Sequence, residues 1–296
     1  MNMSPAAGIR LPHAVARKRS LWSMRWRIFS RNKLAVAGAC LVLLVVIVAV
    51  FAPWIAPYPY DKGNALDAFT KPNAAHWFGT DAVGRDVLSR LVYSLRNACI
   101  VGFGAEAIEL TVGLLIGAVA GYIGGTTDTI LMRVVDIVYG FPSFLLSIIL
   151  VIMLGHNILA VLVAVAATSW VGMARVVRGQ VMTVRQSEYV DAARAMGASW
   201  WQILRRYVLP NSLGPVFVVA AFGIPANMMV ESALSLVGLG LQPPTPSWGT
   251  LISDGQKAVF SYPYLLIFPT VLFALTLLSF TYLGDGLRDA LDSREG

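Results

Sequence analysis

Charged side chains are scarce in this sequence. Only 13% of its 296 residues are Asp, Glu, Lys or Arg, whereas 57% are hydrophobic. Soluble globular domains carry about 25% charged residues, so this composition excludes a soluble protein. It also excludes a disordered chain, because disordered segments are rich in charge and poor in apolar residues. Cysteine is scarce as well: Cys40 and Cys99 lie at or inside apolar runs, which predicts two free thiols and no disulfide framework.

Catalytic and metal-binding motifs are also missing. No HExxH, GxSxG, paired-cysteine or clustered-histidine pattern occurs in the sequence. The segment Gly79–Asp86 matches half of a phosphate-binding loop, but Arg85 and Asp86 stand where that loop needs a Lys and a Ser or Thr. We therefore expect no catalytic residue, no metal site and no cofactor bound by this chain, and we expect that the chain is not an enzyme.

What the sequence does contain is a series of long apolar runs. Six segments are long and apolar enough, or nearly so, to cross a hydrocarbon core about 30 Å thick. They predict an all-α integral membrane protein with six transmembrane helices. The first run is longer than the apolar region of a signal peptide, and no suitable cleavage site follows it, so we expect it to remain uncleaved. The six segments are Leu34–Ile55, Ala98–Ile123, Val134–Leu154, Ile158–Ala174, Leu213–Val230 and Ala258–Gly284.

The orientation follows from Lys and Arg near the ends of the spans. Residues 1–33 hold eight basic residues and no acidic one, so both termini are expected in the cytoplasm. This topology, with anionic lipid at the inner leaflet, accounts for the net charge of +7 without any nucleic acid. The predicted parts are a basic cytoplasmic arm (1–33), a first transmembrane helix (34–55), an extracytoplasmic segment (56–97), a five-helix core (98–284) with a cytoplasmic loop (175–212) and an extracytoplasmic loop (239–261), and a cytoplasmic tail (285–296).

The end of the basic arm has its own pattern. Between Leu21 and Arg31, aromatic and aliphatic residues alternate with arginines. The pattern is typical of an amphipathic helix at the membrane interface. A solvated basic segment that simply precedes the first span fits equally well, and both interpretations stay open.

Glycines recur along the second predicted span. Gly113, Gly117, Gly121 and Gly125 are spaced four residues apart. Small residues at this spacing let two helices approach closely in lipid, so they predict tight helix packing and not a binding site.

Two carboxylates lie inside the same span. Glu106 and Glu109 share one face of the helix, and each would cost roughly 2.5–3.5 kcal/mol if exposed at mid-bilayer. Two interpretations remain: the pair lines a translocation pathway, or it is a structural pair buried against a polar neighbour. Arg133 and Asp136 have the same spacing in the third span, where a local salt bridge is expected.

The predicted cytoplasmic loop is the most informative segment. Helix-forming residues precede Gly197, which interrupts them; Ser199 can cap a second short helix, and Pro210 is expected to end it. A helix–glycine–helix element outside the membrane is suited to docking another protein. The alternative is an amphipathic helix that rests on lipid, anchored by Trp200 and Trp201.

This loop closely resembles the EAA loop of ABC importer permeases. The match consists of Asp191-Ala192-Ala193, Gly197 and Leu209-Pro210, with Asp191 in place of Glu and Tyr207 in place of the usual Ile. Further segments resemble the dipeptide/oligopeptide/nickel branch and its second, C-type permease subunit. These are Phe78–Asp81, Gly84–Arg90, Glu231–Ser235, Gly238–Gly240, Gln242–Gly249 and Gly284–Asp292.

The resemblance implies a type I ABC importer transmembrane domain in a bacterial inner membrane. It implies four partners besides the bilayer: a second homologous permease, two ABC ATPase subunits that use ATP and Mg, and an extracytoplasmic substrate-binding protein. Di- or oligopeptides are the implied cargo, and nickel or a metal chelate is the alternative within the branch. The residues assigned are Glu188, Asp191, Ala192, Ala193, Gly197, Leu209 and Pro210 for ATPase coupling, Glu106, Glu109 and Glu231 for the pathway, and Pro243, Pro244 and Trp248 for contact with the binding protein.

Two other classes of function compete with this interpretation. A self-contained secondary transporter would use Glu106, Glu109 and the prolines within spans, but it leaves the helix–glycine–helix loop unexplained. A polytopic membrane enzyme lacks any catalytic constellation in this sequence.

Overall fold

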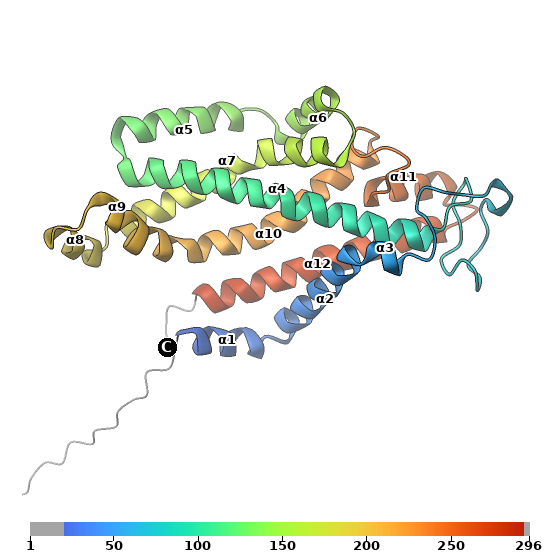
Figure 1. Cartoon of the computed structure of the whole chain (residues 1–296), viewed down its shortest axis with the longest axis horizontal. Helices are drawn as coiled ribbons and strands as arrows, with labels where there is room; N and C mark the ends of the chain where they lie inside the picture. The colour runs from blue at the N-terminus through green and yellow to red at the C-terminus, as the bar shows by residue number, and fades with distance from the viewer. Residues whose placement is uncertain (1–20, 293–296) are drawn as a thin grey trace, which may run out of the picture.

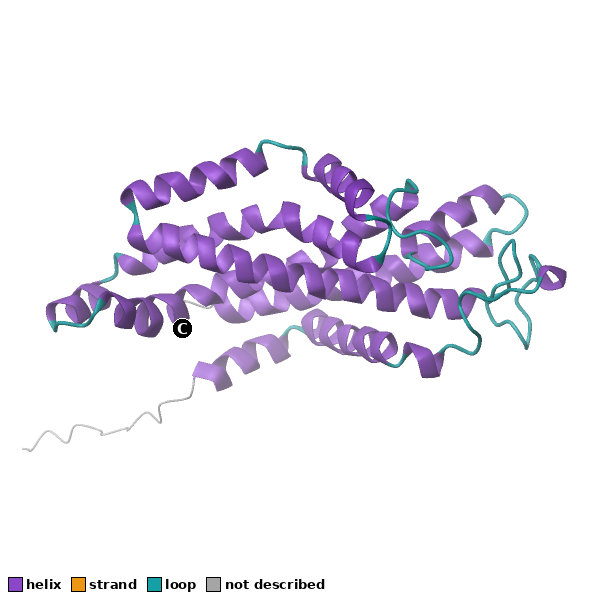
Figure 2. Ribbon diagram, turned by 45° about the horizontal axis from the view of Figure 1, so that its top comes forward, coloured by secondary structure: helices purple, strands orange, loops and turns teal. Residues whose placement is uncertain are grey.

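The computed structural model describes residues 21–292; the remainder of the basic arm and the last four residues lie outside it. Every named element in the described part is helical, and the only β contact there is an isolated bridge between Thr80 and Asp86, so the predicted all-α class is confirmed (Figure 2). The helices are α1 (Leu21–Arg31), α2 (Lys33–Val50), α3 (Ala52–Ile55), α4 (Val87–Ile123), α5 (Gly125–Tyr139), α6 (Ser143–Leu154), α7 (Ile158–Arg185), α8 (Glu188–Ala195), α9 (Trp200–Ile203), α10 (Leu209–Leu236), α11 (Trp248–Ala258) and α12 (Tyr264–Asp292), with a 3-10 turn η1 (Ala65–Asp67) and a π turn η2 (Leu204–Val208).

The long helices form an elongated bundle (Figure 1). The short helices α8 and α9 extend from one end, and α11 lies at the opposite end beside the segment that precedes α4. Five described helices are long and apolar enough to cross a membrane, or six if one bent pair counts as a single span. The predicted number of spans therefore holds only when that pair is included.

The bent pair corrects the third predicted span. In place of one helix over Val134–Leu154, α5 and α6 meet at an angle of 81° around residues 140–142. Pro142 has no backbone N–H, and its ring would clash inside a continuous helix, so the chain leaves the helix at Gly140 and re-enters it at Ser143.

Capping residues define where two of the spans begin. The Asn32 side chain accepts hydrogen bonds from the backbone N–H groups of Leu34 and Ala35 at the start of α2. Asp86 caps α4 in the same way, through the N–H of Ser89 at 2.8 Å. As a result α4 starts eleven residues before the predicted Ala98 and projects beyond the apolar run.

The centre of the bundle is the contact between α4 and α7. A Cβ atom at Gly117 would lie 2.4 Å from the carbonyl oxygen of Ala174, and one at Gly113 or Gly121 would be nearly as crowded. The predicted packing role of these three glycines is confirmed. Gly125 does not share it, because that residue opens α5 after the turn and a Cβ there would touch nothing within 4 Å.

The two ends of the described chain lie together. Helix α1 runs alongside the C-terminal part of α12 (Figure 1), and the Phe29 ring lies directly over Gly286. Asn32 also donates a hydrogen bond to Asp289 at 3.2 Å. Cys40 and Cys99 are both free thiols, as expected.

Candidate functional site

The first candidate region is the projection formed by α8, α9 and η2, residues 188–208, which we term the coupling knob. Gly197 has φ +83°, which an L side chain rarely adopts, and it ends α8. The N–H groups of Gly197 and Ala198 return to the carbonyls of Arg194 and Ala193, a glycine-based helix stop. Ser199 and Gln202 then form a capping box at the start of α9. The predicted helix–glycine–helix arrangement is confirmed.

The knob is anchored to the bundle by an apolar cluster. Val190, Ala193 and Ile203 are buried against Val177 and Val181 of α7. The Tyr122 hydroxyl at the end of α4 adds a hydrogen bond to the Trp200 carbonyl at 2.9 Å. Among the coupling residues assigned from the sequence, Glu188, Asp191, Ala192, Gly197 and Pro210 are exposed, whereas Ala193 and Leu209 contribute to the packing.

The end of the knob differs from the prediction. Pro210 does not terminate a helix; it lies in the first turn of α10, and the helical path is continuous from Trp200 to Leu236. The π turn η2 immediately before it widens the helix, with the Leu209 N–H bonded to the Leu204 carbonyl, so the proline ring is accommodated. The Asn211 side chain donates to the Tyr207 carbonyl at 2.6 Å. The knob is therefore joined without a break to a helix long enough to cross a membrane.

The second region is the buried carboxylate pair of α4. Glu106 and Glu109 both face Asn227 of α10, whose side-chain amide donates to Glu109 at 2.8 Å and to Glu106 at 3.4 Å. Gly223 leaves the room that the Glu106 carboxylate occupies. The pair thus lies inside the chain, against a polar neighbour and away from lipid. Asn227 was not singled out from the sequence, although a carboxamide in the otherwise apolar run Leu213–Val230 is a usable signal.

Glu231 lies elsewhere and has different partners. It is fully buried, and it accepts hydrogen bonds from the hydroxyls of Ser235 at 2.9 Å and Ser232 at 3.3 Å. The structure therefore does not bring the three candidate pathway carboxylates together. The expected Arg133–Asp136 pair is also wrong, because Asp136 pairs with Arg175 of α7 at 2.7 Å.

The third region is the end of the bundle that holds α11. Asp81 accepts hydrogen bonds from the backbone N–H groups of Val83 and Arg85 and from the Arg85 side chain at 2.7 Å, and it lies 3.2 Å from Arg90. Arg90 is completely buried and makes no hydrogen bond through its guanidinium group. The segment Gly79–Asp86, which matches half of a phosphate-binding loop, is therefore a compact ionic turn that stabilises the start of α4.

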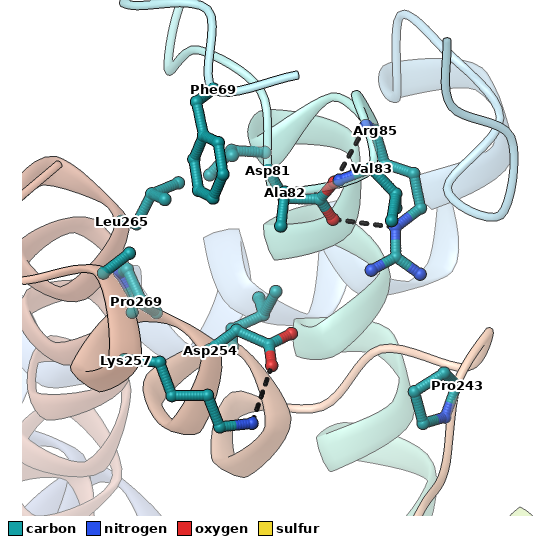
Figure 3. Close-up of a pocket in the computed structure, with 14 residues that line it drawn as sticks. Phe69, Asp81, Ala82, Val83, Arg85, Pro243, Asp254, Lys257, Leu265 and Pro269 are labelled. Carbon is teal, nitrogen blue, oxygen red and sulfur yellow. Dashed lines mark hydrogen bonds and ion pairs between the residues drawn. The ribbon is translucent and has the colours of Figure 1, made fainter. Parts of the chain in front are cut away.

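A cavity of about 450 Å³ opens beside this turn, between the segment before α4, α11 and the start of α12 (Figure 3). Apolar side chains such as Phe69 and Leu265 form part of the cavity wall. The ion pair between Asp254 and Lys257, 3.6 Å apart, also lines the cavity. The Arg85 guanidinium extends from its contact with Asp81 toward the open space.

The residues predicted to contact the binding protein lie at this end, and they differ in exposure. Pro243 and Pro244 are exposed, and Pro243 lines the cavity. Trp248 is only 2% exposed and stacks on Phe273 with ring centroids 5.7 Å apart. Its indole is part of the core, so it offers no surface to a partner.

Comparison with known proteins supplies the family. The family described as binding-protein-dependent transport system inner membrane component matches residues 113–295, and the N-terminal transmembrane domain of oligopeptide transport permease C matches residues 20–73. The oligopeptide transport system permease protein of Haemophilus influenzae is 42% identical over 94% of this chain and 90% of its own length. The dipeptide permease of Bacillus subtilis is 41% identical over 91% of this chain and 84% of its own length, and the glutathione permease of Pectobacterium atrosepticum is 38% identical over 93% and 92%.

A solved structure supports the fold independently. A chain of the MetNI methionine ABC transporter, in an inward-facing conformation, aligns with a TM-score of 0.58 at 17% identity. The alignment covers 68% of this chain and 96% of that one. At this identity the likeness establishes the fold alone, and that fold is the type I ABC importer transmembrane domain.

Proposed function

This chain belongs to the family of binding-protein-dependent transport system inner membrane components, and we propose that it imports di- or oligopeptides as one of two permease subunits. It is a multi-pass protein of the inner membrane and a permease subunit of an ABC transporter. The peptide cargo is inferred from relatives that are 38–42% identical over more than nine-tenths of this chain. Those relatives are named as permeases for oligopeptides, dipeptides and glutathione.

The energy for import comes from separate ATPase subunits that bind the coupling knob. Two features of the knob support this role. Its exposed side includes Asp191, Ala192 and Gly197, and its buried side is packed on α7 and continuous with α10. A short element braced by two long helices can move them as a rigid body, which a flexible loop cannot do.

The opposite end receives the substrate-binding protein outside the cell. Its exposed contact surface includes Pro243, Pro244 and the rim of the cavity beside Arg85. A homologous second permease completes the translocation pathway. In this arrangement the α8–α9 end and both termini lie in the cytoplasm, as the distribution of basic residues predicts.

Reconstitution in vesicles tests the proposal. The chain is assembled with the second permease, the two ATPases and the binding protein of the same organism's transporter, and uptake of a labelled dipeptide and a labelled oligopeptide is measured with and without ATP. We expect uptake only when ATP, the ATPases and the binding protein are all present. Uptake without the ATPases would favour a secondary transporter, and uptake of radioactive nickel but of neither peptide would favour the metal branch.

A further inference from the structure

One arginine near the start of the membrane-crossing helix α4 has no counter-charge. The Arg96 side chain is partly buried, and no hydrogen bond or ion pair joins it to any residue of the described chain, 21–292. Two other arginines of the long helices are paired, Arg90 with Asp81 and Arg175 with Asp136. An unpaired guanidinium is costly in hydrocarbon, so Arg96 requires an anion that this chain does not provide.

Arg96 lies at one end of a groove between α2 and α4. The groove encloses a cavity of about 320 Å³, and every residue that lines it except Arg96 is apolar. Because α4 begins near the point where α2 ends (Figure 1), Arg96 and Val50 mark the same end of the groove, and Phe103 and Val46 mark the other. The lining residues follow one face of each helix: Val46, Ala49 and Val50 on α2, and Arg96, Cys99, Ile100 and Phe103 on α4.

The charged end of this groove lies near a cluster of aromatic side chains. Phe51 and Trp54 directly follow α2, and both are exposed, with ring centroids 5.7 Å apart. On α4, Tyr93 lies one turn before Arg96 and packs on Tyr60, with ring centroids 4.4 Å apart. Exposed aromatic residues of this kind mark the boundary between hydrocarbon and lipid headgroups. Side chains on a helix tilt toward its N-terminus, so Arg96 extends toward this boundary.

The walls of the groove are suited to hydrocarbon. Helix α2 lies at the edge of the bundle, and after Lys33 it contains no charged residue. A helix that is apolar on all sides is surrounded by apolar material. Val50, Ile100 and Phe103 are all exposed along the groove. The groove thus combines a cation at the headgroup level with an apolar channel that runs deeper, which is the polarity of a phospholipid.

We propose that this groove binds one anionic phospholipid, with its phosphate on Arg96 and an acyl chain along Ile100 and Phe103. The planar fork of N–H donors in a guanidinium matches two phosphate oxygens. No Asp or Glu lines the groove, so nothing there pairs with the ammonium group of a zwitterionic headgroup. The lipid belongs to the outer leaflet in the orientation proposed above, but the site itself depends on neither the orientation nor the cargo.

Lipid titration tests the contact with the phosphate. Phosphatidylglycerol is added to the delipidated, assembled transporter in detergent, and the affinity of the tightest site is measured by native mass spectrometry. Arg96→Gln should lower this affinity about tenfold or more, because it removes charge-assisted hydrogen bonds to the phosphate. Lys71→Gln is the control: it removes the same charge from an exposed position in the segment before α4 and should leave the affinity unchanged.

Two results of this titration would overturn the proposal. Equal affinity of the wild type for phosphatidylethanolamine would refute the choice of an anionic lipid. If Arg96 instead pairs with a carboxylate of the second permease, Arg96→Gln would reduce co-purification of that subunit and leave the binding of phosphatidylglycerol unchanged.

A second variant tests the place of the acyl chain. Ile100 is 40% exposed and lines the groove, so Ile100→Trp should fill the groove and lower the affinity for phosphatidylglycerol about tenfold while Arg96 is still present. Leu43→Trp is the matched control, because Leu43 is 60% exposed on α2 and does not line the groove. Co-purification of all subunits shows that both variants assemble. Wild-type affinity in Ile100→Trp would mean that no acyl chain occupies the groove, and the proposal would fail.

Discussion

Ala192 and Ala193 are adjacent in sequence, but α8 buries the side chain of Ala193 and leaves that of Ala192 exposed on the coupling knob. Ala193 is 1% exposed and packs in the cluster with Val190 and Ile203, whereas Ala192 is exposed. The two alanines therefore serve different purposes: one joins the knob to α7, and the other is available to a partner.

This difference predicts opposite results for two identical substitutions. Ala193→Leu should overpack the cluster and destabilise the purified chain by about 1–3 kcal/mol. Ala192→Leu should leave thermal stability unchanged and weaken co-purification of the ATPase subunits. Melting curves in detergent and pulldown of the ATPases measure the two effects. Equal ATPase binding by wild type and Ala192→Leu would show that this side of α8 is not the contact.

The close contact between α4 and α7 predicts different effects for a second pair of substitutions. Gly117→Ala places a Cβ 2.4 Å from the Ala174 carbonyl oxygen, so it should destabilise the fold by about 1–3 kcal/mol. Gly179→Ala on α7 meets no atom within 4 Å and should be neutral or stabilising by about 0.5–1 kcal/mol. Unfolding of the purified chain by denaturant compares them. The packing role would be refuted by equal stability of the two variants.

Gly223 and Glu106 should behave as a coupled pair. A Cβ at Gly223 would lie 1.8 Å from a carboxylate oxygen of Glu106, so Gly223→Ala alone should be strongly destabilising. In Glu106→Ala the obstructing carboxylate is gone, and the added methyl group should then cost little. A double-mutant cycle measured by thermal unfolding should give an interaction energy of about 0.5–3 kcal/mol. Additive effects would contradict the contact.

The buried ionic turn before α4 predicts a large effect from a single carboxylate. Asp81→Asn leaves the fully buried Arg90 without its counter-charge, which should cost about 3–5 kcal/mol. Lys257→Gln breaks the exposed pair with Asp254 and should cost about 0–1 kcal/mol. Thermal unfolding and limited proteolysis of residues 56–86 compare the variants. Similar losses in both would mean that Arg90 is stabilised by another group.

Orientation is tested with single cysteines in the cysteine-free background. Leu66 is 93% exposed in the segment before α4, and Met196 is 78% exposed at the tip of the coupling knob. An impermeant reagent added to intact cells should label Leu66→Cys at once, and Met196→Cys only after permeabilisation. The reverse pattern would invert the topology.

Local sequence determined much of this protein. Charge-free apolar runs are sufficient to specify membrane-crossing helices, because no other backbone structure in a single chain of this composition satisfies its hydrogen bonds in lipid. The stop at Gly197 and the start at Ser199 were also predictable, since helix caps depend on residues only a few positions apart. The close packing along Gly113, Gly117 and Gly121 follows from spacing alone.

The remaining features depended on which surfaces meet. Asp136 could pair with Arg133 on its own helix, but the packing of α5 near α7 brings Arg175 to it. Trp248 lies in a motif that the sequence predicts to be extracytoplasmic, and its ring is nevertheless buried on Phe273. Glu106 and Glu109 are polar at membrane depth, and only the position of Asn227, more than a hundred residues away, decides that they face the interior. Burial and pairing of this kind are set by contacts between distant segments, and a spacing rule within one helix contains no information about them.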